Sequence, residues 1–279
     1  MRRIALFLTA LLVVASACNN KQTVRDEDDA DDLEFRVVSY TSPDSTFTYE
    51  IEAPVEGGTM LADSILNYIW ESLGTEFRDR YNGDNIEEAI LSGASALYEA
   101  RQQEIESFRE DIDDEDSFML NWENSTSISK YVETDEFITF LYNSYEYSGG
   151  AHGMSYLIGT TFLKDTGERL DASIIKDPSN PDFQALFKEK LFAYFNDEEG
   201  GTLGDYLLYQ SEDDDIPLSN MFLRDSSVVF NYQPYEISFY AAGMPEAVFS
   251  FSEIKPYLTK KAIKDLDLDD DEDDDEDED

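Results

Sequence analysis

The chain has little of what most catalytic and metal sites need. Its 279 residues include one cysteine, Cys18, and one histidine, His152. A single cysteine excludes an internal disulfide, and a single histidine excludes a zinc site built from several histidines. Residues 153–157 place a serine after a glycine but lack the second glycine of a nucleophile elbow. These shortages make nucleophilic catalysis and zinc chemistry poor expectations, so no metal and no cofactor is predicted.

Positive charge is also scarce. The chain has 20 Lys and Arg against 63 Asp and Glu, a formal net charge of −43. Residues 267–279 carry twelve acidic side chains, and removing these from −43 leaves −31 for the rest of the chain. Such a field repels nucleic-acid phosphates and anionic membrane surfaces, and it attracts cationic proteins, peptides and divalent cations. The same composition is also expected of a protein selected for solubility or for a salty habitat.

The acidic runs do not match a calcium-binding loop. An EF-hand loop needs glycine at its sixth position and glutamate at its twelfth. Counting from Asp111, these positions hold Asp116 and Trp122, and the acidic run after residue 266 contains no glycine. Weak and diffuse association with Ca²⁺ is compatible with these runs, whereas a shaped calcium site is not predicted.

The first eighteen residues have the order of an export signal. Basic Arg2 and Arg3 precede an apolar run over residues 4–14 and the small residues 15–17, after which Cys18 follows. The run is too short for a membrane-spanning helix and is typical of a secretory signal. Its end resembles the lipobox of bacterial lipoproteins, whose cysteine is acylated, with palmitate among the usual chains. A signal peptide with a chance cysteine is the alternative.

This resemblance predicts the outer parts of the chain. We expect residues 1–17 to be removed and Cys18 to be lipidated, which anchors the protein to a bacterial membrane because buried acyl chains form a stable tether. The expected location is the outer membrane, facing the periplasm or the cell surface. Residues 18–32 are polar and acidic and predict a flexible tether, and residues 263–279 predict a disordered acidic tail.

Between these ends the pattern predicts a folded body. The chain has 18 Phe and 17 Tyr, too many for a disordered chain. Strands and helices come in runs, which favours the α+β class with a largely antiparallel sheet, packed helices and two small, closely associated subdomains at 33–139 and 140–262. The periodicity predicts strands at 34–40, 46–53, 117–122, 127–133, 136–147, 156–163, 228–232, 237–240 and 247–251. It predicts helices at 61–82, 84–108, 182–196, 205–210 and 252–258, with Asp84 and Glu87 as a capping box.

A glycine-rich turn is the clearest candidate site. His152 lies among glycines, which allow positive φ angles and close approach of the backbone to a neighbour. We expect its ring to bond the loop backbone and fix the turn, with ligand contact as the alternative. Nearby tyrosines, with Tyr145 among them, are candidate anchors for a partner. The candidate binding or structural residues are Tyr147, Gly149, Gly150, His152, Gly153 and Tyr156.

Residues 147–153, with the sequence YSGGAHG, resemble the RsiV/PdaC-type extracytoplasmic domain of unknown function. Further similar segments follow in the same order at residues 161–170, 232–243 and 251–258. Together they cover about residues 140–260, and the preceding part is similar to the partner domain usually found before it. The resemblance implies a binding module at the cell envelope. In that family the module stands beside a sigma-binding segment with a membrane helix or beside a deacetylase domain, and we recognise neither here.

The sequence therefore predicts a lipid-anchored binding protein of the cell envelope without enzymatic activity. Its expected ligand is a cationic protein such as a lysozyme-like hydrolase, or else a cell-wall glycan such as a peptidoglycan fragment. The alternative is a hydrolase that cleaves cell-wall or surface glycan with two carboxylates. A deep cleft holding two acids with separated pKa values favours the hydrolase. A shallow, strongly negative face favours the binding protein.

Overall fold

The structure of the chain is a computed structural model, which describes residues 33–83, 85–109, 120–196, 200–208, 211 and 213–269. These residues belong to one compact unit that begins at Leu33. The expected signal, Cys18 and the tether to Asp32 lie outside the described residues, as does most of the acidic tail.

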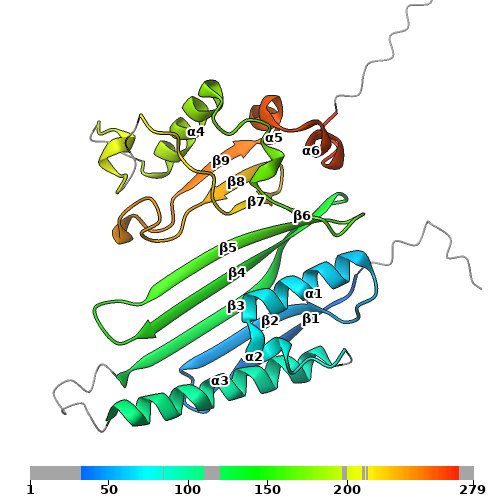
Figure 1. Ribbon diagram of the computed structural model, residues 1–279, viewed down its shortest axis with the longest axis vertical. Helices are drawn as coiled ribbons and strands as arrows, with labels where there is room; N and C mark the ends of the chain where they lie inside the picture. Colours follow the sequence, from blue (N-terminus) through cyan, green and yellow to red (C-terminus); the bar gives the residue numbers. More distant parts are fainter. Residues whose placement is uncertain are drawn as a thin grey trace, which may run out of the picture. The chain divides into compact units, whose positions relative to one another are not determined.

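Two sheets organise the described part of the chain (Figure 1). In the larger sheet six strands lie in the order of the sequence, and all neighbours are antiparallel except β2 and β3. The parallel pair follows from the helical crossover that connects these two strands. The strands are β1 (Phe35–Thr41), β2 (Phe47–Pro54), β3 (Trp122–Glu133), β4 (Phe137–Ser148), β5 (Met154–Leu163) and β6 (Arg169–Leu170), followed in the antiparallel smaller sheet by β7 (Met221–Arg224), β8 (Ser227–Asn231) and β9 (Glu246–Ser250). The predicted α+β class is confirmed.

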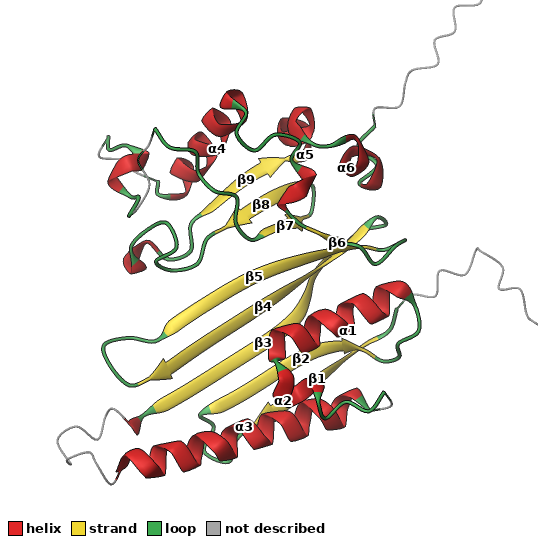
Figure 2. Cartoon of the chain, in the orientation of Figure 1, coloured by secondary structure: helices red, strands yellow, loops and turns green. Residues whose placement is uncertain are grey.

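Three helices pack on one face of the larger sheet, where Figure 2 shows them in red. They are α1 (Met60–Leu73), α2 (Thr75–Arg78) and α3 (Ile86–Arg109). Thr59 begins α1, because its hydroxyl accepts a hydrogen bond from the backbone N–H of Ala62 at 3.1 Å. The predicted helix over 61–82 is interrupted at Gly74, whose φ of 90° ends α1. The chain is helical again in α2, which ends at Arg78, short of residue 82.

The start of α3 differs by one residue from the predicted capping box. The side-chain oxygen of Asn85 accepts from the N–H of Glu88 at 2.9 Å, so Asn85 is the cap that the structure describes. Asp84 lies outside the described residues. Ile90 and Ile105 of this helix are buried, whereas Phe108 is 45% exposed.

The smaller sheet builds a second core with α4 (Pro181–Tyr194). Phe183 and Phe187 of α4 contact Phe249 of β9, with ring centroids 6.1 and 5.6 Å apart. The chain continues through α5 (Phe251–Ile254) and α6 (Lys260–Asp265). Short 3-10 helices occupy Ala172–Ile174, Leu203–Asp205, Tyr240–Ala242 and Lys255–Tyr257.

Several predicted elements are corrected here. The predicted strand at 237–240 is a loop that leads into a 3-10 helix, and the predicted helix at 205–210 is a 3-10 helix at Leu203–Asp205. Strand β7 and helix α6 were not predicted. Because α6 is ordered and Leu266 is 4% exposed, the predicted disordered tail begins too early at residue 263.

The predicted boundary between residues 139 and 140 falls inside β4, which runs unbroken from Phe137 to Ser148. The two sheets meet instead where β5 contacts β7. There the backbone N–H of Leu223 donates to the Thr161 hydroxyl at 2.9 Å, and that hydroxyl lies 2.8 Å from the Thr139 hydroxyl. The ring of Phe222 occupies the space that a side chain at Gly159 would take. The smaller sheet thus packs against β4 and β5 of the larger one.

Candidate binding site at the glycine hairpin

The turn over residues 149–153, here called the glycine hairpin, connects β4 to β5. Gly149 and Gly150 have φ angles of 84° and 103°, which confirms the predicted left-handed backbone at these two positions. The hydroxyl of Tyr147 donates to the carbonyl oxygen of Gly150 at 3.0 Å. Tyr147 thereby fixes the turn from the strand that precedes it.

Gly153 allows a close contact with the Tyr145 ring and does not have a positive φ angle. A methyl group at its Cα would lie 2.4 Å from Cε2 of Tyr145, well inside contact distance. The absence of a side chain therefore lets the Tyr145 ring lie against the hairpin. Of the two properties expected of these glycines, positive φ and close approach, Gly153 shows the second, since its φ is not positive.

His152 connects the hairpin to a distant loop. Its Nδ1 lies 3.0 Å from the carbonyl oxygen of Gly153, the kind of ring-to-backbone bond that the sequence predicted. Its ring stacks on that of Tyr240, with centroids 3.9 Å apart, and the Tyr240 hydroxyl donates to the same carbonyl at 2.9 Å. Sequence reasoning placed Tyr240 in the second similar segment but did not pair it with His152.

The loop that carries Tyr240 is attached to the edge of β5. The side-chain amide of Gln233 donates to the carbonyl oxygen of Leu157 at 2.7 Å and accepts from its N–H at 3.0 Å. This pair of bonds has the pattern of a neighbouring strand. Tyr235, which is 43% exposed, lies 5.6 Å from the Tyr240 ring.

A shallow groove of about 250 Å³ lies along β3, β4 and β5, and we call it the hydroxyl groove. None of the described residues that line it carries a charge. Its lining residues are Ser125, Ser127, Asn143, Ser144, Tyr145, Ser155, Tyr156, Leu157 and Met244. Tyr156, a predicted site residue, therefore belongs with Tyr145 and not with His152.

A second cavity of about 290 Å³ lies between α3 and strands β2–β4, and we call it the arginine pocket. Arg101 places its guanidinium 4.6 Å from the centroid of the Trp122 ring. The same group lies 3.0 Å from Glu104 and 3.6 Å from Glu146. Tyr147 also lines this pocket, so β4 contributes residues to both cavities. The lining residues are Phe47, Tyr49, Leu97, Ala100, Arg101, Glu104, Trp122, Glu123, Asn124, Glu146 and Tyr147.

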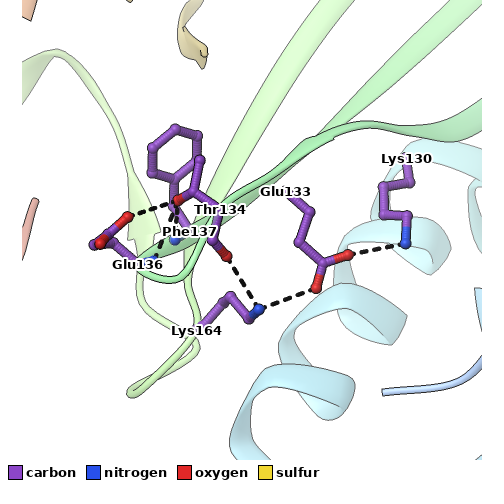
Figure 3. A network of polar contacts seen from close by, with 6 residues as sticks. All are labelled: Lys130, Glu133, Thr134, Glu136, Phe137 and Lys164. Carbon is purple, nitrogen blue, oxygen red and sulfur yellow. Dashed lines mark hydrogen bonds and ion pairs between the residues drawn. The ribbon is translucent and has the colours of Figure 1, made fainter. Parts of the chain in front are cut away.

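Four carboxyl groups elsewhere in the described chain have lowered pKa values. Figure 3 shows Glu133 between Lys130 and Lys164, whose ammonium groups lie 2.9 and 3.0 Å from its oxygens. Partial burial raises the pKa of Glu133, but the hydrogen bonds from the two lysines outweigh it, so the pKa is lowered. The other shifted carboxyl groups in the described segments, Asp44, Asp171 and Glu253, also have lowered pKa values.

Two further properties of the described residues concern metals and membranes. Within the segments that the structure describes, no three His, Cys, Asp or Glu side chains are grouped so that they could hold a metal ion. In the same segments no helix is both long and apolar enough to span a membrane.

Comparison with known families divides the chain near the hairpin. The family model described as "Deacetylase PdaC" matches residues 41–155, and the model described as "Protein of unknown function (DUF3298)" matches residues 172–252. Residues 41–155 are therefore similar to a PdaC-type domain and residues 172–252 to a DUF3298-type domain of unknown function, which supports the predicted resemblance. The contact between His152 and Tyr240 joins these two matched segments.

Solved structures support the same fold. A DUF3298 family protein from Bacteroides fragilis is 17% identical, with a TM-score of 0.69, and the match covers 85% of this chain and 98% of that one. A DUF3298 family protein from Pseudomonas aeruginosa is 14% identical, with a TM-score of 0.50, and the match covers 81% and 94%. Among curated proteins none matches this sequence. These likenesses establish the fold and leave the ligand to be inferred from the site.

Proposed function

We propose that this protein is a lipid-anchored binding protein of the cell envelope that captures a cationic protein. The observation that carries the proposal is a group of exposed tyrosines at the glycine hairpin in a chain of net charge −43. Tyr145, Tyr156 and Tyr235 are 36%, 41% and 43% exposed. Tyrosine is enriched where partners bind, and a strong negative field accelerates encounter with a basic partner.

The first partner to test is a lysozyme-like hydrolase, because such enzymes are basic and the resemblance to the RsiV-type domain points to them. Anchoring is proposed to occur through the lipid on Cys18, which would hold the binding domain at the membrane. These two steps rest on the sequence of the export signal and on the family resemblance.

Binding without catalysis is part of the proposal. A glycosidase of the two-carboxylate kind needs one carboxyl group with a raised pKa to act as the acid. In the described segments every carboxyl group with a shifted pKa is shifted downward. In the arginine pocket, Glu104 and Glu146 are both ion-paired with Arg101. The matching family model is described as a deacetylase, but that description is not carried over to this chain. Among the described residues no group of His, Cys, Asp or Glu could hold the metal ion of a metal-dependent deacetylase.

A cell-wall glycan is the second ligand to consider, and the hydroxyl groove favours it. Hydroxyl and amide side chains without charge, next to the Tyr145 ring, suit a neutral sugar better than a basic protein. A soluble peptidoglycan fragment therefore belongs in the same binding experiment as the basic hydrolases.

The experiment is a biosensor series with the full-length chain on the surface and basic hydrolases in solution. We expect the on-rate to fall steeply as salt shortens the Debye length from about 30 Å at 0.01 M to about 8 Å at 0.15 M. Deleting residues 270–279 should lower the on-rate several-fold at low salt and leave the off-rate nearly unchanged. Tyr145→Ala and Tyr235→Ala should raise the off-rate.

Two outcomes would contradict the proposal. One is the absence of binding by any basic protein up to millimolar concentration. The other is binding that does not depend on salt. Binding of the peptidoglycan fragment in either case would move the function to glycan recognition.

A further inference from the structure

We propose that the arginine pocket is the subsite that receives a basic side chain, the guanidinium of an arginine or the ammonium of a lysine, from the captured protein. This inference rests on the proposed function and assigns a chemical role to one cavity of the described chain.

The pocket already holds the guanidinium of Arg101, which shows the surroundings that a basic ligand side chain would need. The Arg101 guanidinium lies over the Trp122 ring, 4.6 Å from its centroid. Its Nη1 lies 3.0 Å from Glu104 and its Nη2 lies 3.6 Å from Glu146. An aromatic face with flanking carboxylates is a favourable environment for a guanidinium or an ammonium group. The chain itself therefore shows which chemistry this cavity accommodates.

The charges that line the pocket leave room for a second cation. Arg101 contributes one positive charge against the negative charges of Glu104, Glu123 and Glu146. Glu123 is exposed, and its carboxylate forms no ion pair or hydrogen bond with another residue of the described chain. A basic side chain can pair with Glu123 without displacing Arg101. An anionic ligand would meet an excess of negative charge instead.

Size and position fit a single side chain. The cavity volume of about 290 Å³ is at the lower end for small-molecule sites, which suits one side chain better than several sugar rings. Tyr147 lines the pocket, and its hydroxyl holds Gly150 of the glycine hairpin at 3.0 Å. A protein that docks on the hairpin is therefore within reach of the pocket.

The direct test uses N-acetyl-arginine amide as the probe and N-acetyl-citrulline amide as its uncharged counterpart. The indole N–H signal of Trp122 in an NMR titration of the full-length chain reports binding, and Trp122→Phe identifies that signal because the only other tryptophan is Trp70. We expect the arginine probe to shift this signal and the citrulline probe to leave it unchanged. Equal shifts with both probes would overturn the assignment, because the pocket would then not select charge.

Two variants with opposite expected signs sharpen the test. Glu123→Gln should weaken binding of the arginine probe by about twofold to fivefold, the range for one exposed ion pair. Arg101→Gln should strengthen it, because a positive charge leaves the pocket. Glu50→Gln is the matched control, since it changes net charge equally but lies outside the lining of the pocket. If Arg101→Gln abolishes binding, the ligand is an anion and the proposal is wrong.

The same variants in the biosensor series separate this inference from the proposed function. One outcome supports both the proposed function and the pocket assignment: a basic hydrolase binds, Glu123→Gln weakens that binding, and Glu50→Gln does not. If the hydrolase binds equally to all variants, the pocket assignment fails and the proposed function survives. If no basic protein binds, the proposed function fails, and the probe titration still decides whether the pocket binds a cation. Thermal melting of each variant confirms that it is folded.

Discussion

The ring of His152 lies on the ring of Tyr240, with centroids 3.9 Å apart and planes inclined by 21°. Both residues also bond one carbonyl oxygen, that of Gly153. Since His152 follows β4 and Tyr240 belongs to the loop before β9, this contact fastens the two matched domains to each other at the hairpin. It is more readily explained as part of the scaffold than as a reacting group.

His152→Ala should therefore act on stability. We expect the free energy of unfolding to fall by about 1 kcal/mol, the usual contribution of an aromatic pair and one backbone hydrogen bond. Urea denaturation measures this loss. Tyr240→Phe is the matched variant, because it keeps the stacked ring and removes the hydroxyl bond to Gly153. An unchanged stability of His152→Ala together with lost partner binding would make His152 a ligand contact.

Gly153→Ala should destabilise the hairpin through crowding. Its new methyl group would lie 2.4 Å from the Tyr145 ring, so the ring must move, at a cost of about 1–3 kcal/mol. In a Tyr145→Ala background the same substitution should cost much less, because the obstructing ring is gone. Thermal unfolding of the four proteins in this cycle gives the coupling energy. Additive losses would show that backbone strain, and not the ring, is responsible.

Asp44 gives a pH-dependent prediction. Burial raises the pKa of its carboxyl, but hydrogen bonds from Ser42 and Thr46, and then Tyr98, outweigh this and lower it from 3.8 to about 2. A lowered pKa in the folded state stabilises the fold above pH 3.8, and this contribution is lost as the pH falls toward 2. Asp44→Asn should thus cost about 1 kcal/mol near pH 7, since the group is solvent-screened, and much less near pH 2, where about half of the Asp44 carboxyl groups are protonated.

Urea titrations of the wild type and of Asp44→Asn between pH 2 and pH 7 measure this difference. Glu34→Gln serves as the control, because it removes one negative charge from the same region of the chain without removing such a set of bonds. A stability difference that stays constant over the whole range would mean that the bonds of Asp44 do not depend on its charge.

Cys18→Ala tests the proposed anchor. In cells grown with labelled palmitate, the wild type should incorporate the label and fractionate with membranes, because the proposed acyl chains on Cys18 would form the tether. The variant should lose the label and be released or mislocalised. A variant that is still labelled and still sediments with membranes would show that the anchor lies elsewhere.

The sequence predicted those helices and strands that show a clear hydrophobic periodicity within their own residues. Alternation along β2, β4 and β5 and the amphipathic period of α4 located these elements to within one or two residues. The glycine hairpin was predicted because its residues carry their own backbone preference. Helix α6 was missed because the acidic run beyond it hides a short pattern, in which Thr259 caps the helix and Ala262 and Leu266 are buried.

What depends on distant contacts could not be predicted. The segment 237–240 resembles a strand, yet Ile237 and Ser238 are both buried, which a strand with one exposed face does not allow. The Ser238 hydroxyl donates to the carbonyl oxygen of Tyr206, a tertiary bond that the sequence does not reveal. For the same reason, neither the pairing of His152 with Tyr240 nor the arginine pocket was foreseen, since each joins residues from separate elements.

The Gln233 amide on the edge of β5 has a consequence for biosynthesis. Leu157 leaves the ribosome well before Gln233, so the edge of β5 stays open while the first sheet is already complete. An open strand edge invites pairing with other nascent or unfolded chains. The chain is thus most exposed to aggregation during the interval between these two residues. A truncated product that ends before residue 233 should accumulate as insoluble material, even though it contains all six strands of the larger sheet.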